Sequence, residues 1–545
     1  MRMMSRLNAV VLAAVFAAAL PLSAEVTFDR ILNADNEPHN WLSYSRTLTN
    51  QRYSPLDQID VDNVQELELA WIWQARSLEK FEATALAVDG VLYTVQAPND
   101  VVALDAETGR PFWTTTYAPA PEARTCCGRV NRGLAILGDT LYMGTIDAHL
   151  LALDAKTGEI LWNKEVASAK DRYSITMSPL IVKDKVIIGT AGGDGPIRGQ
   201  IAAFDVKTGK ELWRFYTIPG PGEPGNDTWS GDSWKTGGVG VWNAGAYDPE
   251  TNLTFFGTGN PAPDWDGRSR LGDNLYSDSV VALDADTGKL KWHYQFTPHD
   301  ELDYDSTQVP VLADIQFRGK PRKVMLWANR NGLMYVLDRV TGEFLHGRAY
   351  VKVNWADGFD SKGRPQRVPG MVPTKAGTVI RPHVHGATNW APPSFSPRTG
   401  LYYVAHFENS STVAVEGEFP RANGINPRQT TMGQINLQNF LNNEDEAYGV
   451  VRAYDPNTLE PKWEYKMADI TWGGVLTTAG DVVFSGGKEG YFFALDARTG
   501  ALLWKAALGG QVNAGPMSYS VNGKQYVTIA AGNSLFAFAL RGDAK

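Results

Sequence analysis

The segment Ala-Leu-Asp-Ala-Lys-Thr-Gly-Glu-Ile-Leu-Trp, residues 152–162, decides the fold because variants of it recur along the chain. Each copy contains an alternating strand such as 101–104, an Asp-x-x-Thr-Gly turn, and a second strand closed by Trp. Asp and Thr side chains can bond the turn backbone, Gly supplies positive φ, and Trp offers a large apolar surface for packing one sheet on the next. Clear copies end at Trp113, Trp162, Trp213, Trp292 and Trp504, degenerate copies end at His346 and Trp463, and residues 246–256 and 394–404 match more loosely.

Self-similarity at roughly forty to fifty residues, with four short strands per unit, is typical of propeller blades. The 53 Gly and 17 Trp of the 545-residue chain also favour many short strands joined by tight turns. We therefore expect an all-β fold, a single eight-bladed β-propeller over residues 25–545. Segment 41–71 and the strand 535–540 should close the ring, while an insertion at 413–448 widens one interval. A solenoid is the alternative fold.

Residues 1–24 have the pattern of a signal peptide. Arg2 and Arg6 precede a continuous apolar stretch at 9–20, and Leu-Ser-Ala at 22–24 resembles a cleavage site. We expect export to the periplasm and no membrane span in the mature chain, with an uncleaved anchor as the alternative. The net charge of −9 argues against nucleic acid as a partner.

The only two cysteines are neighbours, Cys126 and Cys127. They cannot close an ordinary loop, because a bond between them makes a strained eight-membered ring. The residues alone leave two possibilities, a vicinal disulfide or two free thiols.

The Asp, Thr and Trp of the repeat are structural, so function must lie in residues that interrupt it. The acidic segment 300–305 is one interruption. Glu301, Asp303 and Asp305 alternate, so in an extended segment they would point to one side. Negative charges at such short distances repel one another unless a cation lies between them, and carboxylates are ligands that suit a hard metal ion. The pattern predicts a metal site, with an exposed acidic loop as the alternative.

The complete ordered set of interruptions resembles the PQQ-dependent alcohol and methanol dehydrogenase family. The set comprises the Trp repeats, the adjacent cysteines followed by Val-Asn-Arg-Gly (130–133), Gly-Thr-Gly-Asn-Pro-Ala-Pro (257–263), Pro-His-Asp-Glu-Leu-Asp-Tyr (298–304) and Trp-Gly-Gly (472–474). The resemblance implies that pyrroloquinoline quinone (PQQ) lies between a Cys126–Cys127 disulfide and Trp242, where flat apolar faces suit a planar quinone. The residues implied at the cofactor rim are Glu82, Arg132, Thr176, Asn389 and Trp472, with backbone at Gly192 and Gly193.

The same resemblance implies a metal bound by Asp194, Asn260 and Asp303. The family usually has Glu where Asp194 stands, so this ligand is the least secure of the three. Asp305 resembles lanthanide-dependent members, and an extra carboxylate suits a trivalent ion, so we expect a lanthanide, with calcium as the alternative. Asp303 is implied as the general base, and Arg330 as a donor to the reactive quinone oxygen.

The resemblance implies oxidation of alcohols to aldehydes or ketones. No Cys-x-x-Cys-His motif for haem attachment is present, so electrons are expected to pass to a separate periplasmic c-type cytochrome. A quinoprotein sugar or polyol dehydrogenase and a non-catalytic periplasmic scaffold are the competing functions. The sequence does not identify the alcohol; Asp264, Trp265 and part of the 413–448 insertion are expected at the pocket mouth.

Overall fold

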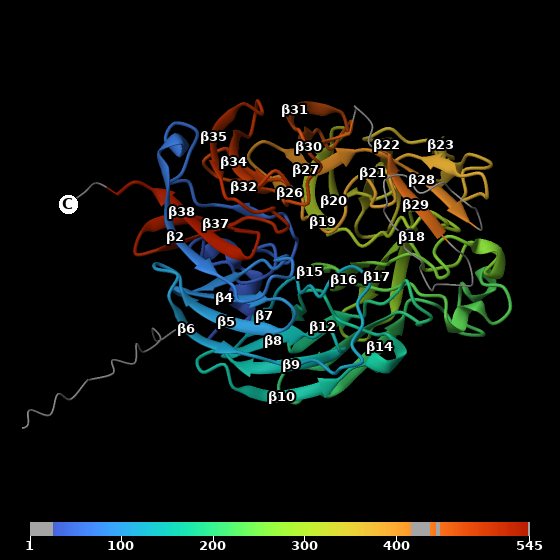
Figure 1. The fold of residues 1–545 in the computed structure, drawn as a ribbon, viewed down its shortest axis with the longest axis horizontal. Helices are drawn as coiled ribbons and strands as arrows, with labels where there is room; N and C mark the ends of the chain where they lie inside the picture. Colours follow the sequence, from blue (N-terminus) through green and yellow to red (C-terminus); the bar gives the residue numbers. More distant parts are fainter. Residues whose placement is uncertain (1–24, 416–436, 443–446, 543–545) are drawn as a thin grey trace, which may run out of the picture.

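Eight sheets are arranged around a common axis, which confirms the predicted eight-bladed propeller (Figure 1). Each has four antiparallel strands, and one of them gains a short parallel fifth strand, β1 (Tyr53–Ser54). The computed structural model describes residues 25–415, 437–442 and 447–542. The predicted signal peptide and most of the 413–448 insertion lie outside these residues. No helix in the described ranges is long and apolar enough to cross a bilayer.

The blades follow one another along the chain, and each runs from an innermost to an outermost strand. The first blade consists of β3 (Leu86–Val88), β4 (Val91–Gln96), β5 (Asp100–Asp105) and β6 (Pro111–Thr115), and the second of β7 (Ala135–Leu137), β8 (Thr140–Gly144), β9 (His149–Asp154) and β10 (Ile160–Glu165). The third consists of β11 (Leu180–Val182), β12 (Lys185–Gly189), β13 (Gln200–Asp205) and β14 (Glu211–Tyr216), and the fourth of β15 (Ala246–Asp248), β16 (Leu253–Gly257), β17 (Ser279–Asp284) and β18 (Leu290–Gln295). The fifth blade consists of β19 (Val311–Phe317), β20 (Lys320–Ala328), β21 (Leu333–Asp338) and β22 (Phe344–Ala349), and the sixth of β26 (Ser394–Ser396), β27 (Leu401–Glu408), β30 (Tyr448–Tyr454) and β31 (Pro461–Met467). The seventh contains β32 (Leu476–Thr478), β33 (Val482–Gly486), β34 (Tyr491–Asp496) and β35 (Leu502–Ala507).

The eighth blade closes the ring with strands from both ends of the chain. It consists of β36 (Met517–Val521), β37 (Lys524–Ala531), β38 (Ser534–Leu540) and, outermost, β2 (Leu67–Gln74). Trp71 of β2 is opposite Ala537 of β38, and Figure 1 shows blue β2 beside red β38. Strand pairing thus joins the two ends as predicted.

The remaining elements are β1 (Tyr53–Ser54), β23 (Ala356–Phe359), β24 (Pro365–Arg367), β25 (Thr378–Ile380), β28 (Ser410–Val415), β29 (Leu437–Asn442), α1 (Phe28–Leu32) and the short 3-10 helices η1 (Ala34–Asn36), η2 (Val64–Glu66), η3 (Ala169–Asp171), η4 (Asn226–Thr228), η5 (Ser233–Lys235) and η6 (Gly267–Ser269).

Every repeat tryptophan except Trp504 packs on the turn of the following blade. The Trp113 indole donates to the Ala155 carbonyl at 3.2 Å and lies against Gly158. The Asp154 carboxylate caps that turn by accepting from the backbone N–H of Lys156 and Thr157. The same Trp–Gly contact joins Trp71 to Gly109, Trp162 to Gly209, Trp213 to Gly288, Trp292 to Gly342 and Trp463 to Gly500. The repeat residues are therefore structural, as predicted.

Gly158→Ala is expected to lower the free energy of unfolding by about 2 kcal/mol or more. Gly158 has φ +76°, and a Cβ there would lie 2.5 Å from Thr115 Oγ1 and 2.6 Å from the Trp113 ring. Gly90→Ala is the matched control, because Gly90 has φ +89° with no atom within 4 Å of a Cβ. Guanidinium unfolding should show a clearly larger loss for Gly158→Ala; equal losses would contradict blade docking through this glycine.

Two details of the repeat differ from the expectation. Val101–Leu104 is buried on both sides rather than alternating, because blades pack against both faces of a middle strand. The loose matches at 246–256 and 394–404 are hairpins between the first two strands of a blade, whereas the other copies join the third and fourth. The seven closer copies thus mark seven blades, and the eighth lacks one because its third strand is the last of the chain.

Antiparallel pairing divides the connections between two faces of the propeller. Connections between first and second strands and between third and fourth strands share one face, which we call the turn face. Connections between second and third strands, and from each outermost strand to the next blade, share the other, which we call the site face. Every residue predicted to bind cofactor or metal lies in a connection on the site face.

Candidate functional site

Arg330 joins two of the predicted site carboxylates. It lies in the β20–β21 connection, where Nη2 donates to Asp303 Oδ2 at 2.8 Å and Nη1 donates to Asp305 Oδ2. Nη2 also donates to the Val384 carbonyl at 2.7 Å, which fixes the guanidinium. Arg330 and Asp305 side chains are 6% and 7% exposed, and Asp303 is 18% exposed. Asp303 is thus the carboxylate of this pair more open to a ligand.

The loop carrying Asp303 is held by a buried aspartate. Asp300 accepts from the backbone N–H of Leu302 at 3.0 Å and of Tyr304 at 2.8 Å. Between them Asp303 has φ +59°, a conformation that non-glycine residues adopt rarely and that recurs at functional sites. Asp303 Oδ1 has no hydrogen-bond partner among the described residues. The loop therefore presents one fixed carboxylate oxygen that is free to bind.

The predicted alignment of Glu301 with Asp303 and Asp305 is wrong. Because Asp303 has positive φ, the segment is not an extended strand. Glu301 instead accepts from Gly267 N–H at 3.0 Å and pairs with Arg367 at 3.4 Å. Glu301 therefore stabilises a neighbouring loop.

Asn260 connects Asp305 to a further carboxylate, Asp264. The Asn260 backbone N–H donates to Asp305 Oδ1 at 2.9 Å, and its side-chain Nδ2 donates to Asp264 Oδ1 at 2.8 Å. Asp194 lies in the β12–β13 connection and borders a cavity of about 670 Å³ that Ser230, Ser233 and other residues line. We call Asp194, Asp264, Asp303 and Asp305 the acidic cluster; Arg330 and Asn260 join three of its members.

Burial and mutual repulsion raise the pKa of three carboxyls of the cluster. Burial, then the Asp305 charge, raise the pKa of Asp194 to about 6, and Arg330 opposes the shift. Burial and neighbouring carboxylates also raise the pKa of Asp303 and of Asp264 well above the usual range. A bound cation would relieve both effects, because it stabilises the ionised forms.

Arg132 gathers a second set of predicted residues. Its guanidinium lies 2.8 Å from Glu82 Oε2, donates to Thr176 Oγ1 at 3.0 Å, and lies 4.9 Å from the centre of the Trp242 ring. The Arg132 and Glu82 side chains are 6% and 2% exposed, and burial raises the pKa of Glu82. Arg132 Nε has no hydrogen-bond partner among the described residues. The arrangement offers a buried cation beside an aromatic plane, which suits a flat anionic ligand.

Trp242 joins the two sets of residues. Its indole Nε1 lies 3.4 Å from Asp305 Oδ1, while its ring faces Arg132. A planar ligand on the Trp242 ring would therefore lie between the Arg132 side and the acidic cluster. The 3.4 Å contact requires tertiary structure, since 63 residues separate Trp242 from Asp305.

The structure resolves the two possibilities for the cysteines in favour of a disulfide. Cys126 and Cys127 are bonded, and both are exposed in the β6–β7 connection that leads to Arg132. Within the described part of the chain, no hydrogen bond ties them to Trp242. Gly193 packs so closely on the loop before Trp242 that a Cβ would lie 2.7 Å from Gly240 N, while neighbouring Gly192 has φ +113°.

Trp390, which the sequence analysis did not single out, follows Asn389 in the chain and stacks on Trp472. The Trp390 and Trp472 rings stack 4.7 Å apart, and the Arg132 guanidinium lies 5.8 Å from the Trp390 ring. Asn389 donates to the His385 carbonyl at 3.0 Å. Trp390 could have been found from the sequence, because it directly follows Asn389 in the segment Gly-Ala-Thr-Asn-Trp (386–390). Asp264 was expected at the pocket mouth, whereas the structure buries it at 4% exposure beside Asn260.

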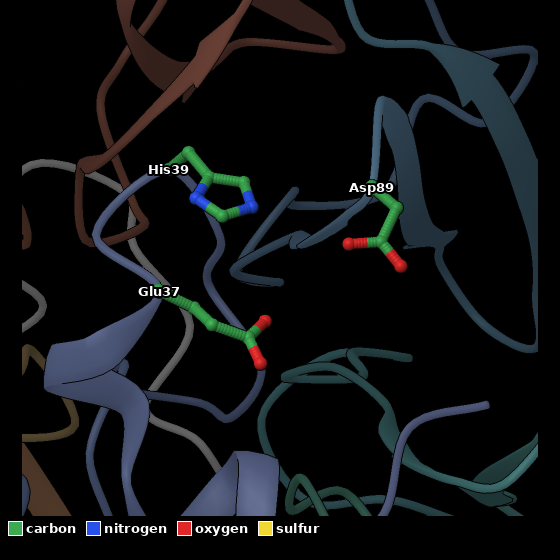
Figure 2. Close-up of side chains that lie close together, drawn as sticks. All are labelled: Glu37, His39 and Asp89. Carbon is green, nitrogen blue, oxygen red and sulfur yellow. The ribbon is translucent and has the colours of Figure 1, made fainter. Parts of the chain in front are cut away.

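A different trio of potential metal ligands, Glu37, His39 and Asp89, lies near the turn face (Figure 2). Arg30 pairs with Glu37 at 2.7 Å and with Asp89 at 2.8 Å. Asn40 also donates to both carboxylates, each at 2.9 Å. The two carboxylates thus already share the Arg30 guanidinium and the Asn40 amide, and these contacts fasten the N-terminal segment to the first blade.

Comparisons with known proteins agree with this architecture. Residues 41–356 and 432–527 match the glucose/ethanol/alcohol dehydrogenase β-propeller domain family, designated PQQ. Quinohemoprotein alcohol dehydrogenase ADH IIB of Pseudomonas putida is 41% identical over 94% of this chain and 76% of its own length. Quinoprotein alcohol dehydrogenase PedH of the same species is 37% identical over 93% of this chain and 89% of its own length.

Two solved structures have closely similar folds. A quinohemoprotein alcohol dehydrogenase from Comamonas testosteroni has a TM-score of 0.87 and 36% identity, covering 95% of this chain and 83% of its own. A europium-containing methanol dehydrogenase has a TM-score of 0.87 and 32% identity, covering 94% of this chain and 100% of its own.

Proposed function

The chain belongs to the PQQ-dependent alcohol dehydrogenase family of β-propellers, and we propose that it oxidises alcohols by using Asp303 as the base beside a metal ion and PQQ. The observation that carries this proposal is the fixed Asp303 carboxylate, whose Oδ2 is held by Arg330 while Oδ1 is left without a partner. A base must be oriented and have one oxygen free to accept a proton.

The acidic cluster and Asn260 suit a hard metal ion. Carboxylate and amide oxygens are the donors that calcium and lanthanides prefer. Asp194 borders a cavity, so its carboxylate is available to a cation. Asp194, Asn260, Asp303 and Asp305 would hold the ion.

The surroundings of Trp242 suit PQQ, a planar tricarboxylate. The Trp242 ring offers a flat face beside the Arg132 guanidinium, and Arg132 and Thr176 supply donors next to it. The Cys126–Cys127 disulfide is proposed to cover the opposite face of the cofactor. Glu82, Asn389 and Trp472, with backbone at Gly192 and Gly193, complete the proposed rim.

When bound, PQQ supplies a hydride acceptor and the metal supplies a Lewis acid that polarises the reacting carbonyl. Asp303 Oδ1 would take the hydroxyl proton of the alcohol. Arg330 keeps Asp303 in place through Nη2 and adds positive charge at the same point. The Asp300 hydrogen bonds to Leu302 and Tyr304 keep the loop rigid, so that little reorganisation is needed.

A lanthanide is the proposed metal, with calcium the alternative. Asp305 is 7% exposed and lies beside Asn260 and Arg330, so it brings an additional negative charge into the site. A trivalent ion gains more than a divalent ion from each added carboxylate. The europium named for a similarly folded methanol dehydrogenase is consistent with this choice.

The electron acceptor is proposed to be a separate c-type cytochrome in the periplasm. Cys126 and Cys127 are the only cysteines of the sequence and are bonded to each other, so neither is available to attach a haem. Export is proposed from the signal-peptide pattern of residues 1–24.

A polyol or sugar is the second candidate substrate. The cavity of about 670 Å³ beside Asp194 is bordered by the hydroxyl side chains of Ser230, Ser233, Thr236 and Ser269. Hydroxyl groups there could hydrogen-bond the additional hydroxyls of a polyol, which a simple alcohol lacks.

Reconstitution tests the proposed function. Protein stripped with a chelator is supplied with PQQ plus lanthanum or calcium, and dye reduction is followed with ethanol, a secondary alcohol, glycerol and glucose. We expect activity only with both PQQ and a metal, a higher rate with lanthanum, and an aldehyde or ketone product. Absence of quinone absorbance and of any gain on adding PQQ and metal would refute the proposal.

A further inference from the structure

Asp264 is a buried carboxylate that forms no direct ion pair in the described part of the chain, although the buried Arg270 acts on it at longer range. It is 4% exposed and lies in the β16–β17 connection, four residues after Asn260. Its Oδ1 accepts from Asn260 Nδ2 at 2.8 Å, and no lysine or arginine pairs with it among the described residues. Burying an ionised carboxylate with a single amide partner is costly, so this position calls for a cation or another reason to keep the acid.

Comparison with Asp300 shows that Asp264 is not placed as a structural cap. Asp300 is equally buried, but its two oxygens accept backbone N–H groups at 3.0 and 2.8 Å, as a loop-capping aspartate does. Asp264 accepts from no backbone group in the described ranges. Its partner is instead the side chain of a proposed metal ligand.

Asp264 also belongs to the acidic cluster electrostatically. The carboxylates of Asp194, Asp303 and Asp305 all act on it, and only Asp303 and Asp305 are paired with Arg330. Arg330 thus pairs with two of the four carboxylates, while the buried Arg270 acts on Asp264 without bonding to it. Asp194 and Asp264 have no ion pair among the described residues.

We propose that Asp264 is a further acidic residue of the metal site, which orients the Asn260 amide and adds negative charge that favours a trivalent ion. With Nδ2 held by Asp264 and the backbone N–H held by Asp305, Asn260 is left with its carbonyl oxygen Oδ1 as the ligand atom. The negative charge of Asp264 compensates for the shorter reach of the Asp194 carboxylate, which stands where the family usually has Glu. This inference rests on the metal site proposed above and assigns to it a residue that acts through Asn260 and through its charge.

Terbium binding tests the role of Asp264 independently of turnover. The metal-free full-length chain is titrated with Tb³⁺ while luminescence sensitised by tryptophan is recorded; Trp242 lies 3.4 Å from Asp305 and is a suitable donor. Calcium affinity is obtained by competition in the same cell. Asp264→Asn should weaken Tb³⁺ binding by about tenfold or more, and weaken calcium binding less. A defect of folding alone would lower both affinities alike.

Asp266→Asn is the matched control. Asp266 lies two residues away and pairs with Arg268 at 2.8 Å, so its loss should leave the Tb³⁺ affinity within about twofold of the original protein. Thermal unfolding of each variant checks the fold, and Asp264→Ser, which keeps an acceptor without the charge, replaces the Asn variant if that one misfolds. If an Asp264 variant binds Tb³⁺ with the same affinity as the original chain, the proposal is overturned. Failure of the unsubstituted chain to bind Tb³⁺ would instead refute the metal site itself, and the role of Asp264 with it.

Discussion

Asp303→Asn is expected to lower kcat by about a thousandfold or more while PQQ remains bound. Asn has nearly the shape of Asp but cannot accept the hydroxyl proton, and its amide oxygen is a weaker metal ligand. The free oxygen Oδ1, the bond from Arg330 and the positive φ are all properties of this one residue. Dye-linked turnover is measured together with quinone absorbance and metal content.

Glu301→Gln is the matched control for Asp303. It removes one carboxylate from the same loop, two residues earlier, but that side chain contacts Gly267 and Arg367. Its turnover should remain within a few-fold of the original protein. Near-normal turnover of Asp303→Asn would reject Asp303 as the base.

Asp305→Asn is expected to abolish lanthanide-supported activity, a loss of at least about a hundredfold, and to reduce calcium-supported activity less. Asn can still accept from the Asn260 backbone N–H, so the variant mainly removes charge. A trivalent ion loses more electrostatic stabilisation than a divalent ion when one carboxylate is removed.

The measurement compares lanthanum and calcium reconstitution of the same protein batch, with bound metal determined by elemental analysis. The calcium arm serves as an internal control for misfolding, because a misfolded protein would lose both activities. Unchanged activity of Asp305→Asn with lanthanum would exclude Asp305 as the determinant of metal preference.

The blade architecture could be predicted because its signals are local. An Asp-x-x-Thr-Gly turn, its caps and the tryptophan that ends the same copy lie within about a dozen residues, as in 152–162, so seven blades are visible in the sequence. The eighth was expected from the length of the chain, which allows seven to nine blades, and from the need to pair both ends, which β2 and β38 do. The alternating pattern expected for 101–104 was wrong because neighbouring blades bury both sides of that strand.

The candidate site was predicted unevenly. Glu82, Arg132, Thr176 and Trp242 had been named by resemblance, and the structure brings their side chains together. Their grouping could not be read from spacing, because 160 residues and three blades separate the first from the last. Trp390 was not assigned to the site and Asp264 was expected only at the pocket mouth, since an indole in a loop and an aspartate beside a proline are common without function.

The sequence by itself determined the repeat, the propeller class and the position of seven blades, because these follow from local turns. Only the tertiary structure decided which side chains of the site face meet. It turned Glu301 away from Asp303, left one oxygen of Asp303 free, and brought Asp264 to Asn260. The physical reason is that these contacts depend on loop backbone angles and on the packing of separate blades, neither of which leaves a periodic trace in the chain.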